Sequence, residues 1–198
     1  MGKIVISSNS TLDGVVQDPD GEEGFARGGW FHRFVGADDL QAWVARETEE
    51  LRGVEALLFG RRSSGWFETR MLSRDDAETR VSPEWATGVK SLPKYIVSST
   101  LDRSRWSNAT ILNGDAAKEI SELKRTMDGE ILVYGSYQLV CTLIDHGLAD
   151  ELRLVVFPVV LGTGLRLFDE TSQRPLRLVD IRKIGRSLAF HTYEFQRS

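Results

Sequence analysis

The sequence predicts an α/β domain whose mixed, mostly parallel sheet carries helices on both faces and ends in an antiparallel C-terminal β-hairpin. Two patterns indicate this fold class. Short apolar runs alternate with segments of helical periodicity up to about residue 150, and only strand patterns follow. The composition agrees, because 198 residues with 41% hydrophobic and 27% charged side chains are enough for one hydrophobic core. We therefore expect a single domain over residues 1–198.

The N-terminal third begins with a strand and a long loop. A short β-branched run predicts a strand over 3–8, and a glycine-rich loop is expected over 9–37. Loops of this length inside a compact domain are usually functional. A helix is expected to be capped by Asp38 or Asp39 and to run to about Arg52. Its apolar side chains recur at helical spacing: Leu40, Trp43, Val44 and Leu51.

The middle of the chain continues the alternation of strands and helices. Residues 70–92 are charged and weakly patterned, so we expect a surface excursion there. Helices are expected after the turn at 60–64, after Asp115 as an N-cap, and after Gly135-Ser136. Strands are expected over 54–59, 94–98, 110–112 and 131–134.

The last fifty residues contain strand patterns alone. A long strand is expected over 151–160, followed by strands over 176–184 and 187–195. Gly185-Arg186 separates the last two, which alternate polar and apolar residues, so they form the antiparallel hairpin.

Charge and cysteine usage exclude several classes of protein. With 25 basic and 29 acidic residues the net charge is −4, so we expect no nucleic-acid partner bound through phosphate neutralisation. Apolar runs fall short of the ~18 residues of a membrane span, so we expect no membrane partner. The single Cys141 excludes a disulfide framework, and the three histidines lack metal-ligand spacing, so no metal is expected. We expect a cytoplasmic protein.

Polar residues follow three of the predicted strands, and in open α/β sheets ligands bind beyond the carboxyl ends of strands. A helix N-terminus attracts anions, and arginine pairs well with phosphate. Each segment alone could equally be a solvated, capped helix start. Together they favour a nucleotide site. The three segments are Gly60-Arg61-Arg62-Ser63, Ser98-Ser99-Thr100 and Gly135-Ser136.

Two carboxylates are candidates for the chemistry. Asp13 lies in a Leu-Asp-Gly turn at the rim of the first strand. Glu47 lies seven residues after Leu40 and three after Val44, inside the apolar stripe of its helix. A carboxyl group there is costly unless it faces a cavity or a partner, and a raised pKa would suit proton delivery. The alternative is a salt bridge at the edge of the stripe. Aromatic side chains that could line a ring pocket, or simply fill the core, are Trp30, Phe31 and Trp66.

At this point the chain resembles a known family. Matching segments occur in the expected order over most of its length: STLDG at 10–14, LFGRRS at 58–63, KYIVSSTL at 94–101, ILVYGS at 131–136, LADEL at 148–152 and PVVLGTG at 158–164. The chain is similar to the RibD C-terminal domain, the reductase domain of the bifunctional riboflavin-biosynthesis deaminase-reductase, within the dihydrofolate reductase-like superfamily. It would be a stand-alone member.

The resemblance implies a dihydrofolate reductase-like fold and NADPH as the hydride donor. Residues 60–63 match the turn that holds the adenosine phosphate end, and residues 98–100 match a second phosphate-contacting strand end. Gly135-Ser136 matches the turn under the pyrophosphate, and Asp13 the carboxylate near the substrate. The substrate by resemblance is 5-amino-6-(5-phosphoribosylamino)uracil. We expect Asp13 or Glu47 to orient the substrate or, directly or through water, to help protonate it.

Two alternatives stay open. The first is a dihydrofolate or pteridine reductase, which would need a carboxylate at the ring, with Glu47 as the candidate. The second is a non-catalytic nucleotide-binding or assembly protein that kept the fold. An antiparallel strand left at a sheet edge also predicts a homodimer.

Overall fold

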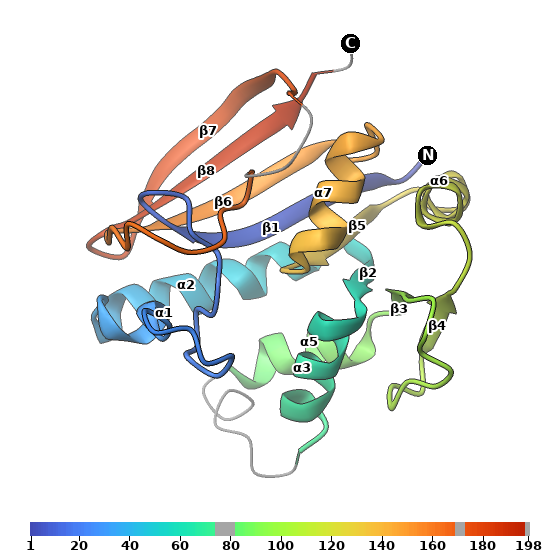
Figure 1. The fold of residues 1–198 in the computed structure, drawn as a ribbon, viewed down its shortest axis with the longest axis horizontal. Coiled ribbons are helices and arrows are strands. Elements are labelled where there is room, and N and C mark those ends of the chain that lie inside the picture. The colour runs from blue at the N-terminus through green and yellow to red at the C-terminus, as the bar shows by residue number, and fades with distance from the viewer. Residues whose placement is uncertain (74–81, 169–172, 197–198) are drawn as a thin grey trace.

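An eight-stranded sheet in the order β4-β3-β2-β5-β1-β6-β8-β7 forms the centre of the molecule (Figure 1). It is seen in a computed structural model that describes residues 1–73, 82–168 and 173–196. Strands β1 to β6 pair in parallel, and β8 pairs antiparallel with β6 and β7. The strands are β1 (Lys3–Thr11), β2 (Val54–Gly60), β3 (Lys94–Val97), β4 (Ala109–Leu112), β5 (Glu130–Tyr134), β6 (Glu151–Phe157), β7 (Leu176–Ile184) and β8 (Leu188–Phe195).

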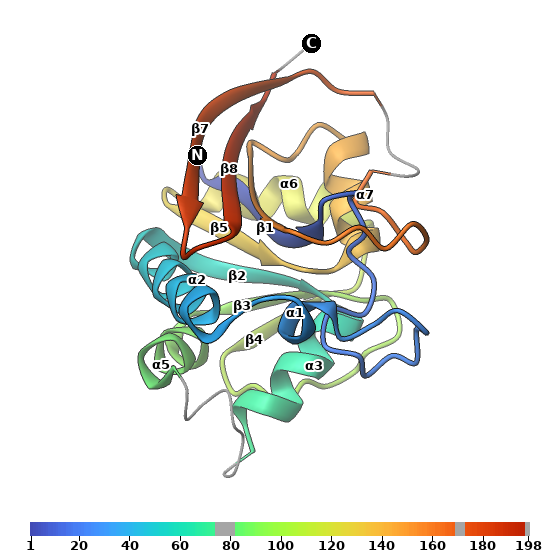
Figure 2. The ribbon, with the colours of Figure 1, turned by 90° about the vertical axis from the view of Figure 1, so that its left-hand side faces the viewer.

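Helices cover both faces of the sheet, as Figure 2 shows, with α2 and α5 on one side and α6 and α7 on the other. The helices are α1 (Trp30–Arg33), α2 (Ala37–Glu50), α3 (Arg61–Met71), α5 (Pro83–Ser91), α6 (Ala116–Thr126) and α7 (Tyr137–Asp145), and a 3₁₀ turn over Leu51–Gly53 follows α2. The predicted mixed, mostly parallel sheet with helices on both faces and a terminal hairpin is therefore confirmed.

The core is divided by the sheet. Because successive side chains of a strand point to opposite faces, Ile4 and Ile6 pack toward α6 and α7, whereas Val5 packs toward α3 and α5. A third cluster, around Phe157 and Phe190, lies under α1, α2 and the hairpin. Strands buried on both faces explain why the parallel strands are continuous apolar runs in the sequence.

Three boundaries differ from the sequence prediction. Strand β1 continues to Thr11, because it pairs with β6 as far as Phe157. Strand β6 ends at Phe157, before Pro158, which cannot donate a ladder hydrogen bond. Helix α5 lies in the segment expected to be a surface excursion, and it buries Trp85, Ala86 and Val89. Residues 74–81 of that segment lie outside the described residues.

The capping of α2 also differs from the prediction. The helix begins at Ala37 after Gly36, and neither Asp38 nor Asp39 caps it. The Asp39 carboxylate instead accepts hydrogen bonds from the backbone N–H groups of Arg186 and Ser187 in the turn between β7 and β8. The first turn of α2 therefore ties the hairpin to the body of the domain. Asp115, by contrast, caps α6 as expected, accepting from the Lys118 N–H at 2.8 Å.

Within the described ranges, no helix combines the length and the apolar character that crossing a membrane requires.

Candidate functional site

A cavity of about 1550 Å³ opens at the carboxyl ends of the central strands, and all three predicted ligand-facing segments line it. Residues 60–63 follow β2, residues 98–100 follow β3, and residues 135–136 follow β5. The segments meet because β3, β2 and β5 are neighbours in the sheet and run in the same direction. The sequence separations between them are 35 residues or more, so only the parallel topology brings them together.

The turn after β5 has an unusual backbone. Gly135 and Ser136 are both left-handed, with φ of +56° and +63°, which glycine adopts easily and serine rarely. The Ser136 hydroxyl accepts a hydrogen bond from the Gly60 N–H at 2.9 Å and donates one to the Ser63 hydroxyl at 2.7 Å. A plain N-cap of α7 was one of the alternatives for Ser136, but its side chain makes no cap hydrogen bond and instead joins the β5 turn to the β2 turn.

Two helices point their N-termini into this region. Helix α3 starts directly after Gly60 and α7 directly after Ser136; neither has a side-chain cap or an acidic residue in its first turn. The N–H groups at such ends carry partial positive charge. Arg61 and Arg62 add two cations, both exposed at the cavity wall. Arg61 donates from Nη1 to the Thr100 hydroxyl at 2.6 Å, which links the ends of β2 and β3.

Glu47 lies on the wall contributed by α2, and its side chain is buried, with 4% of the residue exposed. Burial is the largest cause that raises the pKa of Glu47, to about 7, and the neighbouring Glu50 carboxylate adds to it. The Arg46 guanidinium, which donates to Glu47 Oε1 at 2.7 Å, and a hydrogen bond with Tyr134 act in the opposite direction. Glu47 thus combines the two alternatives considered for it: it lines the cavity and it is ion-paired.

Tyr134 is a site residue that the sequence did not indicate. It ends β5, is buried at the cavity wall, and accepts from Trp85 Nε1 at 3.4 Å. Burial raises the pKa of its hydroxyl well above the ordinary value, and the Glu47 and Glu50 charges raise it further. The hydroxyl therefore stays protonated and can donate. Its position at a strand end beside Gly135 was the available signal, but a buried tyrosine is common in cores.

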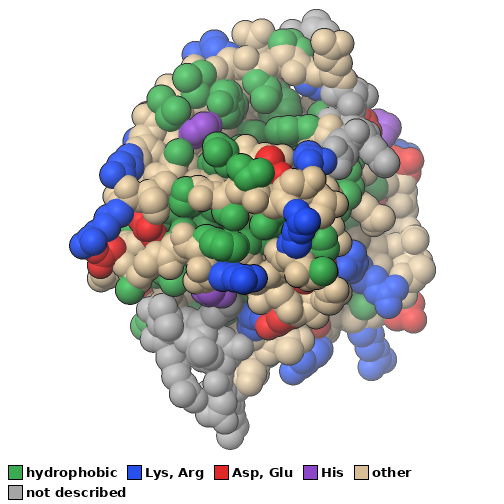
Figure 3. All heavy atoms as spheres, turned by 60° about the vertical axis from the view of Figure 1, so that its left-hand side comes forward, with side chains coloured by type: hydrophobic (Ala, Val, Ile, Leu, Met, Phe, Trp, Pro, Cys, Tyr) green, Lys and Arg blue, Asp and Glu red, His purple; other side chains and the backbone are tan. Residues whose placement is uncertain are grey.

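Apolar and aromatic side chains form the rest of the wall. Phe31, Leu40 and Trp43 lie on one side, and Trp66 and Trp85 on the other. Of the three aromatic residues proposed as ring contacts, Phe31 and Trp66 line the cavity. Trp30 is fully buried instead, packed edge-on against Phe157 with ring centroids 5.3 Å apart. Figure 3, which looks at this side of the molecule, shows hydrophobic side chains gathered in the middle of the face, with Lys and Arg side chains beside them.

Asp13 has a different environment from Glu47. It is not among the described residues that line the cavity. Its carboxylate accepts from the Thr11 hydroxyl at 2.7 Å and from the N–H groups of Leu161 and Gly162 at 3.1 and 2.7 Å. These hydrogen bonds outweigh desolvation and lower the pKa of Asp13 to about 2. The structure thus places Asp13 as the ionised anchor of the loop after β6, which does not fit the expected proton donor.

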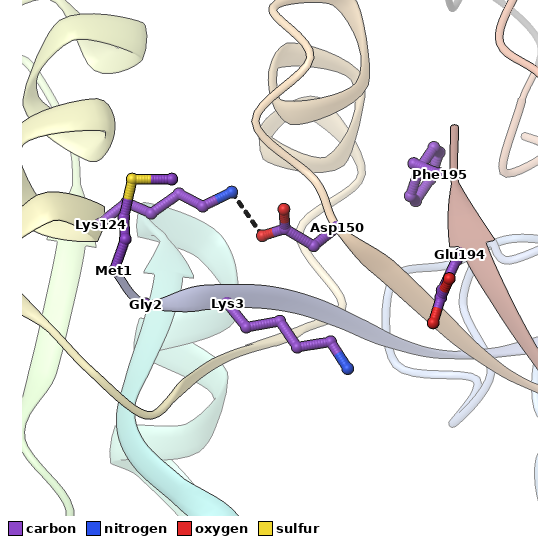
Figure 4. Close-up of a pocket in the computed structure, with 7 residues that line it drawn as sticks. All are labelled: Met1, Gly2, Lys3, Lys124, Asp150, Glu194 and Phe195. Carbon is purple, nitrogen blue, oxygen red and sulfur yellow. Dashed lines mark ion pairs between the residues drawn. The ribbon is translucent and has the colours of Figure 1, made fainter. Parts of the chain in front are cut away.

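A second, smaller hollow of about 310 Å³ lies beside the N-terminus, at the start of β1 (Figure 4). Its charged groups are already engaged with one another: Lys124 with Asp150, and Lys3 with Glu151 at 2.6 Å. It contains none of the predicted site residues. The large cavity is therefore the candidate site.

Comparisons with known proteins agree with this geometry. The model of the RibD C-terminal domain matches residues 2–190. The uncharacterised Bacillus subtilis protein YyaP is 28% identical over 194 residues, covering 98% of this chain and 95% of YyaP. A Shewanella sp. PV-4 structure, provisionally assigned to riboflavin biosynthesis, has a TM-score of 0.72 at 20% identity and covers 98% of this chain and 99% of its own.

A Thermotoga maritima structure, described as a diaminohydroxyphosphoribosylaminopyrimidine deaminase and 5-amino-6-(5-phosphoribosylamino)uracil reductase, has a TM-score of 0.61 at 15% identity. The match covers 98% of this chain and 57% of that one. These structural likenesses support the dihydrofolate reductase-like fold expected from the sequence. The family model covers nearly the whole chain, and it shows that this protein belongs to the RibD C-terminal domain family.

Proposed function

We propose that this protein is an NADPH-dependent reductase of a small heterocyclic substrate. One observation carries the proposal: a set of anion-binding groups from three strand ends and a buried, protonatable carboxyl group line the same cavity. Membership of the RibD C-terminal domain family supports an oxidoreductase. The substrate by family is 5-amino-6-(5-phosphoribosylamino)uracil, and the protein is proposed to be a cytoplasmic enzyme.

The residues present fit the phosphates of a dinucleotide. Two uncapped helix N-termini, the left-handed Gly135-Ser136 turn, and the pair Arg61 and Arg62 lie together, and each is a recognised anion-binding feature. Ser63, Ser98, Ser99 and Thr100 add hydroxyl groups at the same edge. Pockets for one small ligand usually measure ~300–1,000 Å³, so a cavity of about 1550 Å³ has room for a cofactor and a substrate.

When bound, NADPH supplies the hydride, and this chain has to orient the ring and supply a proton. The aromatic wall formed by Phe31, Trp43 and Trp66 can hold a flat ring. Glu47 can then donate a proton at neutral pH, because its pKa of about 7 leaves much of it protonated. Tyr134, hydrogen-bonded to Glu47, keeps that carboxyl group oriented.

A pteridine reductase is the second candidate, and the position of Glu47 favours it. A buried carboxyl group beside aromatic side chains is what recognition of a pteridine ring would require. The two candidates differ in the substrate and share the cofactor site, so one series of measurements separates them.

The test is titration of the purified protein with NADPH, followed by tryptophan fluorescence, since Trp43, Trp66 and Trp85 line the cavity. The variant Arg61→Ala/Arg62→Ala should weaken NADPH binding by at least about tenfold, because hydrogen bonds to charged groups contribute about 1.5–3 kcal/mol each. The matched control is Lys118→Ala/Arg125→Ala, which removes the same charge from the exposed side of α6.

Turnover is then measured by loss of the reduced nicotinamide absorbance with a ribosylaminopyrimidine or a dihydropteridine. Consumption with one ring class identifies the substrate. Binding of NADPH without turnover of either would favour the non-catalytic nucleotide-binding alternative, and absence of NADPH binding would contradict both reductase proposals.

We further propose a homodimer formed through β7, the edge strand of the sheet. Leu178, Val179 and Ile181 are large apolar side chains exposed on this strand, and an exposed apolar edge favours pairing with another strand. Antiparallel pairing of two copies centred on Ile181 would place Asp180 of each copy opposite Arg182 of the other. The edge is therefore complementary to itself in both charge and apolar character.

A further inference from the structure

A partly buried cluster of charged side chains lies between α2 and the sheet, behind the cavity wall. Its members come from four elements, and consecutive members are joined by ion pairs. We call it the α2 charge cluster: Lys3, Arg46, Glu47, Glu50, Glu130, Glu151 and Arg153. Glu47 is its member at the cavity, and Lys3, at the other end, reaches the surface at the small hollow of Figure 4. Burying so many charges is costly, and stability alone does not explain it.

Arg46 divides its hydrogen bonds unequally between the two carboxyl groups of α2. Nη1 and Nη2 donate to Glu50 at 2.9 and 2.8 Å, and Nη1 alone donates to Glu47, at 2.7 Å. The guanidinium also lies over the Phe190 ring of β8, 4.2 Å from its centroid, which fixes its plane. Arg46 is therefore turned toward Glu50, which accepts two of its three hydrogen bonds to carboxylates, whereas Glu47 accepts one.

Glu50 in turn is held from the sheet side. Its carboxylate accepts from the Ser7 hydroxyl of β1 at 3.0 Å and from Arg153 Nη1 of β6 at 3.2 Å. Arg153 is itself positioned by Glu151 at 2.6 Å and Glu130 at 2.8 Å. Nearby carboxylates raise the pKa of Arg153 still further above its ordinary value, so it is always charged. Glu50 is therefore paired with two guanidinium groups, those of Arg46 and Arg153.

The charge count leaves the cluster one proton short of neutrality. Three cations, Lys3, Arg46 and Arg153, face four carboxyl groups. Burial raises the pKa of the Glu47 carboxyl group to about 7. The groups facing it are Arg46 and Glu50 on α2 and the Tyr134 hydroxyl of β5, behind which lies Trp85 of α5. In the described part of the chain, Arg46 is the cation within hydrogen-bonding distance of Glu47.

We propose that Glu50 is a positioning residue: by holding the Arg46 guanidinium toward the sheet, it leaves the single proton of the α2 charge cluster on Glu47, at the cavity wall, while Arg153 balances the charge of Glu50. The use of that proton in reduction rests on the proposed function. The position of that proton in the ligand-free protein does not depend on the proposed function, so it can be tested separately.

The proposal predicts opposite effects for two variants. In Glu50→Gln, Arg46 loses its main anionic partner and turns to Glu47, and a like charge disappears. Glu47 should then titrate at least about one pH unit lower. In Arg153→Met, the cluster loses a cation while Glu50 keeps its hydrogen bonds to Arg46. Glu47 should therefore titrate about half a pH unit higher. A merely structural role for these residues would not move the titration of Glu47 in opposite directions.

The experiment is a titration of the carboxyl ¹³C signals of the full-length protein by NMR, without cofactor or substrate. Comparison with Glu47→Gln assigns the Glu47 signal. The controls are Glu49→Gln and Arg52→Met, which remove one charge of each sign from exposed positions at the same end of α2; both should leave the Glu47 titration unchanged. Glu50→Asp, which keeps the charge, should restore most of the wild-type value.

If Glu50→Gln does not fold, Arg153→Met and Arg153→Lys still test the proposal. Arg153→Met should raise the pH at which Glu47 titrates, and Arg153→Lys should return it to the wild-type value. A Glu47 signal that titrates in the ordinary range of an exposed glutamate, or that shifts in the same direction in both variants, would overturn the proposal. Opposite shifts in the ligand-free protein, combined with no reductase activity, would support the positioning role and contradict the proposed function.

Discussion

Replacing Glu47 by glutamine should remove a pH dependence from the stability of the domain. In the native protein burial raises the pKa of Glu47 from 4.5 to about 7. Between those two values the native state holds a proton that the unfolded chain has released, so stability falls as the pH rises. A shift of this size corresponds to roughly 3 kcal/mol, lost between about pH 4.5 and pH 7. Glutamine resembles the protonated acid and does not titrate.

The difference in unfolding free energy between Glu47→Gln and the wild type should therefore change by about 3 kcal/mol across this window, with the variant relatively more stable at high pH. Urea denaturation, followed by circular dichroism at a series of pH values and one protein concentration, measures that difference. Glu49→Gln, on the exposed side of the same helix, should give a constant difference. A constant difference for Glu47→Gln as well would refute the raised pKa and, with it, the assignment of the proton.

Three other substitutions test separate parts of the structure. Asp13→Asn should destabilise the domain by about 1–2 kcal/mol at neutral pH, because the N–H groups of Leu161 and Gly162 lose a charged acceptor. Urea unfolding measures the loss of stability, and an unchanged midpoint would contradict the role of Asp13 as the anchor of this loop. Gly135→Ala should lower the free energy of unfolding by about 1–2 kcal/mol, since the φ of +56° at this position disfavours a Cβ. It should also weaken NADPH binding in the fluorescence titration. A variant as stable as the wild type would show that the turn relaxes freely. Ile181→Lys should shift the protein from dimer to monomer in analytical ultracentrifugation, because it places two like charges at the centre of the β7 pairing; a wild-type monomer would rule out the proposed dimer.

The sequence located the three predicted ligand-facing segments because each is a local pattern: a buried strand followed by hydroxyl or basic residues, which at 60–63 and 135–136 also include a glycine before a helix. Parallel strands in one sheet end at the same edge, so the prediction that the segments 60–63, 98–100 and 135–136 meet needed no further knowledge of the fold. Their role in holding a cofactor stays a prediction.

Glu47 shows where the same reasoning stops. Its place in the apolar stripe indicated a carboxyl group facing a cavity or a partner, and both proved present. The stripe itself, however, lines the cavity, while the face of α2 that packs on the sheet carries Arg46 and Glu50. A charged helix face is ordinarily predicted to face solvent. Here Arg153, more than a hundred residues later in the sequence, supplies the opposing charge, and local periodicity contains no information about it.

The surroundings of Asp13 and the burial of α5 both depend on distant parts of the chain. The Leu-Asp-Gly turn could have faced a ligand, but the N–H groups that engage Asp13 belong to a loop about 150 residues away. Helix α5 has few apolar residues, so its pattern was weak. Its burial depends on Trp85 and Val89 meeting a sheet face formed by distant strands.

The sequence by itself determined most of the order of strands and helices, the antiparallel end of the sheet and the edge at which the three predicted segments meet, because these follow from local periodicity and the direction of parallel strands. Only the tertiary structure decided that the pKa of the Glu47 carboxyl group is raised. Protonation depends on the balance of burial and charge around a side chain. Around Glu47 that balance is set by residues of α2, β1, β5 and β6, which only the folded chain brings together.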